Sequence, residues 1–170
     1  MLTIKLSFRK QGGDDVDGLI RAIPLVTPAL LETAVDMVHG IVADVFTGEG
    51  ASEFTPMPWA PLARSTIDDR LMLGFAEGPI LERTGSLIGA MTEEGADGHI
   101  VERSLSGAGS GKVRIGTTDF RFAAHQTGTP TNSKWLPKRV IWPEDEGRTN
   151  ALEAISSEVM ETATRLLNGR

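Results

Sequence analysis

The chain has 170 residues, which fits one domain with a sizeable core, and its 23 acidic and 17 basic residues give a net charge of −6. The absence of cysteine excludes disulfides, thiolate metal sites and cysteine nucleophiles, and it fits a reducing cytoplasm. The basic residues are scattered and form no patch of the kind that grips nucleic acid, the densest group being Lys134, Lys138 and Arg139.

The N-terminal half predicts a strand followed by a long helix. Residues 2–8 alternate apolar and polar side chains, which indicates a half-buried strand and not a signal peptide. Thr27 and Pro28 are typical of an N-cap and a first helical position, and Gly48 and Gly50 are typical of a helix end. Between them one face is expected to be buried: Leu31, Val35, Val38, Val42 and Val45. No run of about 18 apolar residues predicts a membrane span.

The central part predicts loops, short helices and a hairpin. Residues 48–62 contain three prolines and read as an extended loop. A short helix is expected around residues 64–73. A second is expected over about 79–91, with Ile80, Leu81, Leu87, Ile88 and Met91 packed inward. Residues 99–105 and 112–116 predict two strands joined by a flexible loop.

The last third predicts two helices. Residues 118–126 form one or two helical turns, which Gly128 ends in the left-handed conformation. Asn150 and Glu153 resemble a capping box for a final helix, whose predicted buried stripe is Leu152, Ile155, Val159, Ala163, Leu166 and Leu167. We therefore expect an α+β fold in a single domain over residues 1–170. In it, a small antiparallel sheet, made from the first strand and the 99–116 hairpin, is packed by the long N-terminal helix and the C-terminal helix.

No catalytic, metal or cofactor site is predicted from the motifs. The loop at residues 107–112, GAGSGK, lacks the first glycine and the hydroxyl of a Walker motif and precedes a strand, so we interpret it as a hairpin loop. His39, His99 and His125 have no second ligand at the local spacing of a zinc site. His125 lies in the segment FAAHQTG, at a helix end before Gly128, which favours a structural role in fixing the next loop.

The tryptophans Trp59, Trp135 and Trp142 each lie in a loop that contains proline. A tryptophan in such a loop either covers the core of its own chain or anchors a partner. The sequence alone leaves both interpretations open.

Several segments occur in an order that resembles a known family. They are WAPL at 59–62, PILERTGSL at 79–87, VRIGT at 113–117, FAAHQTG at 122–128 and LPKR at 136–139, followed by the C-terminal helix. This order resembles the phage virion morphogenesis family, the tail-completion proteins of Mu-like and P2-like phages, over roughly residues 25–167. The motif positions are Trp59, Leu62, Thr84, Gly85, Leu87, His125, Gly128, Pro137 and Arg139. The chain departs from the family pattern at Phe122, Thr127 and Lys138.

The resemblance implies a structural neck protein of a tailed phage or prophage, and no enzyme. Such a protein completes the tail and joins it to the head, commonly as a ring; a hexamer is suspected, with DNA at most passing through the lumen. It is expected in the virion, after assembly in the host cytoplasm, with tail-tube and connector proteins as partners and neither membrane nor cofactor. A stopper or adaptor ring on the head side is an alternative, and a small hydrolase using His125 and a carboxylate is a second.

A ring closes through two different faces on each subunit. From the loop tryptophans and the charges beside them, we predict a contact segment at residues 134–146. The candidate interface residues are Trp59, Lys134, Trp135, Lys138, Arg139 and Trp142.

Overall fold

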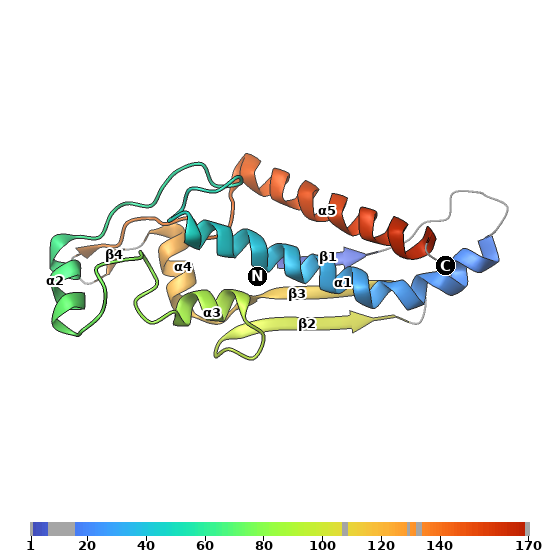
Figure 1. Cartoon of the computed structure of the whole chain (residues 1–170), viewed down its shortest axis with the longest axis horizontal. Coiled ribbons are helices and arrows are strands. Elements are labelled where there is room, and N and C mark those ends of the chain that lie inside the picture. The colour runs from blue at the N-terminus through green and yellow to red at the C-terminus, as the bar shows by residue number, and fades with distance from the viewer. Residues whose placement is uncertain (1, 7–15, 107–108, 129, 132–133, 169–170) are drawn as a thin grey trace. The chain divides into compact units, whose positions relative to one another are not determined.

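The computed structural model describes residues 2–6, 16–106, 109–128, 130–131 and 134–168 (Figure 1). The chain forms two compact units, each built from segments that are distant in sequence. Unit 1 comprises Met1–Val38, Ile100–Gly116 and Leu152–Arg170, and unit 2 comprises His39–His99 and Thr117–Ala151. Because the chain passes repeatedly from one unit to the other, no single linker separates them. The expectation of a single domain stays a prediction.

Unit 1 is built around a three-stranded antiparallel sheet. The strands are β1 (Leu2–Leu6), β2 (His99–Leu105) and β3 (Gly111–Thr117), in the order β1-β3-β2. β1 pairs with β3 in a register that sets Ile4 opposite Val113. Since side chains alternate along a strand, Val113 and Ile115 are buried, whereas Lys5 and Lys112 are exposed on the other face.

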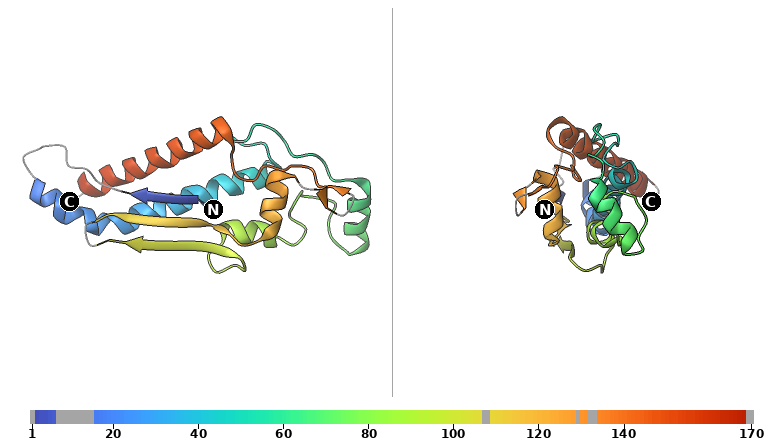
Figure 2. Two further views of the ribbon diagram at one scale, coloured as in Figure 1. Left: turned by 180° about the vertical axis from the view of Figure 1, so that it is seen from behind. Right: turned by 90° about the vertical axis from the view of Figure 1, so that its left-hand side faces the viewer.

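Two helices, α1 (Val16–Thr47) and α5 (Asp145–Asn168), pack on this sheet, which confirms the predicted α+β arrangement. Figures 1 and 2 show the first part of α1 and the last part of α5 lying alongside the three strands. The apolar core of unit 1 is contributed by both helices and the central strand: Val26, Leu30, Leu31, Ala34, Val35, Val38, Val113, Ile115, Ile155, Val159 and Ala163.

The predicted start of the first helix is wrong, because α1 begins at Val16 and carries Thr27 and Pro28 in its interior. Thr27 is buried, and its Oγ1 lies 2.8 Å from both Ile23 O and Gly109 O. The hydroxyl therefore ties the helix to the hairpin loop of β2 and β3 and caps nothing. Pro24 and Pro28 are exposed, so the carbonyl groups that lose N–H partners to proline lie on the outer side of the helix.

The start of the last helix is also earlier than predicted. α5 begins at Asp145, so Asn150 lies inside the helix and does not cap it. Asp145 and Glu146 occupy the first turn, where negative charge is favourable. In the predicted stripe Ile155, Val159 and Ala163 are buried, whereas Leu152 is 38% exposed.

Unit 2 contains the short elements α2 (Arg64–Met72), α3 (Ser86–Thr92), α4 (Phe120–Thr127), β4 (Pro130–Thr131) and β5 (Lys134–Trp135). A second apolar cluster is formed by the end of α1, by α3 and by loop residues: Val42, Val45, Phe46, Trp59, Ile80, Leu87, Met91 and Ile141. The expected helix over residues 79–91 is confirmed only from Ser86 onward. Leu81 and Gly85 have positive φ angles of 64° and 72°, which turn the chain so that both Ile80 and Leu87 enter the cluster.

Residues Ala22–Thr47 of α1 are long and apolar enough to cross a membrane by length and composition alone, with a hydropathy of 1.4. Core helices share these properties, and the buried stripe of α1, predicted from its periodicity, is confirmed at all five positions from Leu31 to Val45. We therefore interpret α1 as a core helix.

Candidate functional site

The segment FAAHQTG forms α4, a two-turn helix with a defined cap at each end. Asp119 caps the start, because its Oδ1 accepts a hydrogen bond of 2.9 Å from Arg121 N. Gly128 ends the helix with a φ of 65°, and its N–H donates to Ala124 O. A Cβ added at Gly128 would lie 2.8 Å from Lys138 N. The predicted left-handed glycine is confirmed, and the loop at Lys138 packs directly against it.

Gln126 attaches the end of α4 to the chain that precedes α5. Its Oε1 accepts the N–H groups of Ile141 and Trp142 at 2.9 and 3.0 Å. Its Nε2 donates to Trp142 O at 2.8 Å and to Glu144 Oε1 at 3.1 Å. One side chain thus bonds two backbone N–H groups and one backbone carbonyl. In a sheet, these groups would be paired by a neighbouring strand.

His125 acts on the same loop through its backbone, because its carbonyl accepts a hydrogen bond of 2.7 Å from Arg139 N. Its Nδ1 is buried and has no hydrogen-bond partner in the described part of the chain. Burial, together with the nearby guanidinium groups of Arg139 and Arg121, lowers the pKa of His125 to about 4. The following loop is thus fixed by the side chain of Gln126 and by the backbone carbonyl of His125, and the buried Nδ1 of His125 takes no part in holding it.

Trp59 and Arg139 hold the same loop from the side of WAPL. Trp59 is 6% exposed, donates from Nε1 to Val140 O at 2.8 Å and packs edge-on against Phe46. Arg139 is 5% exposed, and its Nη2 donates to Ala60 O at 3.1 Å. Burial lowers the pKa of Arg139. Residues 138–142, which we call the clamped segment, are therefore fixed both by α4 and by the loop around Trp59.

The remaining motif residues lie in the same unit. Leu87 is buried and Leu62 packs against the apolar cluster of unit 2. Gly85 provides the positive φ at the start of α3, where the hydroxyl groups of Thr84 and Ser86 lie 2.9 Å apart. Pro137 is half-buried beside the clamped segment. Unit 2 thus contains all nine motif positions, although their segments span about 80 positions of sequence.

The candidate interface residues differ in how far they are buried in their own unit. The burial of Trp59 and Arg139 in their own unit contradicts a role as exposed anchors, because each side chain completes the core or bonds its backbone. Trp142 is half-buried against the apolar cluster, and Lys138 is exposed and forms an ion pair of 2.5 Å with Glu144. For Lys134 and Trp135 the structure describes only the backbone, which pairs with β4; their side chains lie outside the described residues.

An open hollow of about 370 Å³ lies where α3 and α4 begin, lined by Thr84, Gly85, Ser86, Gly89, Glu93, Ala96, Asp97, Asp119 and Arg121. The Asp119 carboxylate accepts hydrogen bonds from Arg121, which lower the pKa of Asp119. His125 does not line the hollow. Within the described ranges, no group of three His, Asp or Glu side chains is placed to hold a metal ion.

Two features of the structure are absent from the sequence-based predictions. His39 and His99 are 60 positions apart, yet their rings lie 5.0 Å from centroid to centroid. Leu71, Met72 and Leu73 are 46%, 79% and 55% exposed at the end of α2. Three consecutive large apolar residues at the end of a short helix cannot all face a core, so the sequence itself indicates exposed apolar side chains there.

Comparison of the chain with protein-family models, with curated proteins and with solved structures found no match.

Proposed function

We propose that the chain is a structural neck protein of a tailed phage or prophage, which completes the tail and joins it to the head as a ring. The supporting observation is that three of the five motif segments meet at the clamped segment. WAPL contributes Trp59 and the carbonyl of Ala60, FAAHQTG contributes Gln126, and LPKR contributes Arg139. Segments that resemble the tail-completion family thus meet in one place and are joined by hydrogen bonds.

This arrangement suits a binding protein because it presents a rigid surface. The clamped segment is held by hydrogen bonds from both sides, so little conformational entropy remains to be lost when a partner docks. Trp142 in this segment is half-buried, so part of its side chain is accessible to a partner. The predicted contact segment at residues 134–146 is therefore retained, with Lys138 and Trp142 as its described contact residues.

Unit 2 also exposes apolar side chains that a partner can cover. The exposed Leu71, Met72 and Leu73 at the end of α2 form a second candidate surface, and Met57 is 79% exposed in the loop before it. Exposed apolar groups are common singly, but a contiguous run of three is typical of an interface. We assign this surface and the contact segment at residues 134–146 to the neck proteins that adjoin the ring.

Deletion and complementation in the phage or prophage that encodes the chain test the proposal. Without the chain, induced cells should yield filled heads and separate tails by negative-stain electron microscopy, and the wild-type gene should restore joined particles. Complementation with Lys138→Glu/Trp142→Ser should leave heads and tails unjoined, whereas the control Arg148→Glu, at an exposed position of α5, should restore joining. Arg139 is unsuitable for this test, because its side chain is buried.

Joined, infectious particles in the deletion strain would contradict the proposal. Tails of abnormal length point to tail completion, whereas heads that lose their DNA point to the stopper alternative.

A further inference from the structure

The charges of the chain are divided unevenly between the two units. Unit 2 contains 14 of the 23 acidic residues and 8 of the 17 basic residues, so the entire net charge of −6 belongs to it, and unit 1 is neutral. Opposite potentials on two surfaces steer copies of a chain together and fix their orientation. Each unit carries a charged surface that has no counter-charge of its own.

Unit 1 has such a surface on the sheet face opposite its core. Lys5 of β1 lies directly opposite Lys112 of β3, and both are exposed. Arg114 is two positions along the same strand and pairs with Glu102. Like charges directly opposite each other across an antiparallel pair destabilise the sheet. Neither lysine has an ion-pair partner in the described structure, so this sheet face contains uncompensated positive charge.

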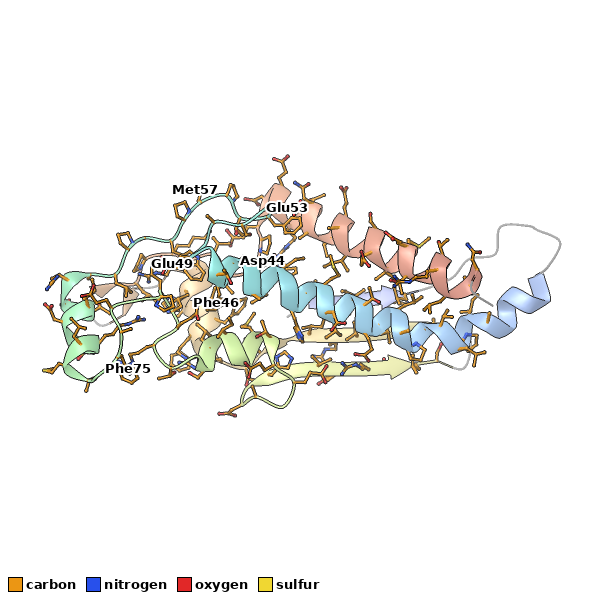
Figure 3. The ribbon with its side chains drawn as sticks, viewed as in Figure 1. Asp44, Phe46, Glu49, Glu53, Met57 and Phe75 are labelled. Atoms are coloured by element: carbon orange, nitrogen blue, oxygen red, sulfur yellow. The ribbon has the colours of Figure 1, made fainter. Side chains whose placement is uncertain are left out.

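Unit 2 has the opposite feature at the end of α1. Asp44, in the last turn, and Glu53, in the loop that follows, are exposed, with Glu49 between them in sequence (Figure 3). A helix C-terminus carries partial negative charge, and the last turn of α1 contains no basic residue. Within the described residues Asp44 and Glu53 form no ion pair. Negative charge is thus collected where the helix dipole disfavours it.

We propose that these surfaces bind each other between copies of the chain, the sheet face around Lys5 and Lys112 of one copy docking on the acidic end of α1 around Asp44 and Glu53 of the next. Each surface is electrostatically unfavourable alone, and each supplies the charge that the other lacks. Because the surfaces differ, the contact is heterologous and propagates head to tail. The role of this contact in closing the ring rests on the proposed neck function. The association itself is a property of the purified chain and can be measured without phage particles.

Light scattering after gel filtration, at low and at high salt, tests the contact. The wild-type chain should associate at low ionic strength and dissociate as salt screens the charges. Lys5→Glu/Lys112→Glu and Asp44→Lys/Glu53→Lys should each weaken association at least tenfold, because each places like charges at the contact. An equimolar mixture of the two variants should associate again, since each variant then complements the other. Arg148→Glu/Arg165→Glu, at exposed positions of α5, is the control with the same change of charge as the lysine variant, and it should associate like the wild type.

Circular dichroism confirms that each variant is folded before it is compared. A wild-type chain that stays monomeric at low salt and high concentration would overturn the proposal, as would association that is indifferent to both charge reversals. Binding of a short DNA duplex that is lost in Lys5→Glu/Lys112→Glu would assign the sheet face to nucleic acid and would also overturn it. Failure of the deletion experiment in phage assembly, with charge-dependent association intact, would count against the neck function alone.

Discussion

Replacement of Gln126 should destabilise unit 2 more than any other single change in α4. The amide oxygen accepts from Ile141 N and Trp142 N, and the amide nitrogen donates to Trp142 O. Gln126→Leu leaves these three backbone groups without partners. A buried polar group that loses its partner costs about 1–3 kcal/mol, and these sites are partly buried. We expect the free energy of unfolding to fall by about 3 kcal/mol and the Tm to fall by about 6–12 °C.

A conservative change separates the donor role of Gln126 from its acceptor role. Gln126→Glu retains the accepting oxygen but at neutral pH places a carboxylate against Trp142 O and Glu144, the two acceptors of the amide nitrogen. We expect a loss of about 2 kcal/mol at pH 7. The two acceptors raise the pKa of the introduced carboxyl group above its ordinary value of about 4.3, and a protonated carboxyl group donates a hydrogen bond. The difference from the wild type should therefore shrink as the pH falls toward about 4.3 and be smallest below it.

Urea denaturation of the wild type and the variants measures these effects. Thr127→Val is the matched control, because Thr127 is exposed and its hydroxyl bonds only within the helix, to Ala123 O. It should change stability by less than about 0.5 kcal/mol. A Gln126→Leu variant as stable as this control would refute the argument that the amide holds the clamped segment.

Three further changes test other contacts by thermal or urea denaturation. Gly128→Ala should cost at least about 2 kcal/mol, since its Cβ meets Lys138 N. Gly74→Ala, with a φ of 80° and open space around the Cβ, should cost only about 1 kcal/mol. Equal losses would show that the clash with Lys138 is unimportant. Thr27→Val should cost about 1–2 kcal/mol through its lost bond to Gly109 O. Thr33→Val, whose hydroxyl bonds to Ala29 O within the helix, should change stability little. A neutral Thr27→Val would contradict the tether. His125 has a folded pKa of about 4, below its ordinary 6.5, so the unfolded chain binds more protons between these values and stability falls as pH falls through this window. The full pKa shift corresponds to about 3 kcal/mol of stability, which partial exposure of His125 reduces to about 1 kcal/mol. His125→Ala should be less stable at pH 7 and should lose this part of the pH dependence. An unchanged pH profile would contradict the lowered pKa of His125.

Periodicity predicted the parts of the fold that depend on burial. The buried stripe of α1, the strands at residues 99–105 and 112–116, and the packing of two helices on one sheet follow from apolar spacing alone. Helix starts were predicted less well, because Thr27-Pro28 and Asn150 have cap-like chemistry that the tertiary structure uses differently. Thr27 is buried against the hairpin loop, and Asn150 lies one turn inside α5.

Around α4 the backbone conformation at Gly128 was predicted, whereas the side chain that holds the next loop was not. Gly128 was expected to redirect the chain and does so, with Lys138 packed against it. The side chain that holds the loop is Gln126 and not His125, because an amide both donates and accepts whereas the buried Nδ1 of His125 is unbonded. Trp59 was open between two interpretations, and its bond to Val140 O favours the core. Such long-range partners leave no local spacing that a single sequence reveals.

Localisation of the chain within assembled particles tests the central claim most directly. The chain can be tagged at its C-terminus in the phage or prophage that encodes it, and the particles labelled with gold-conjugated antibody for electron microscopy. The neck function predicts gold at the junction of head and tail, once per particle. Label spread along the tail or over the head, or particles that contain none of the chain, would contradict it.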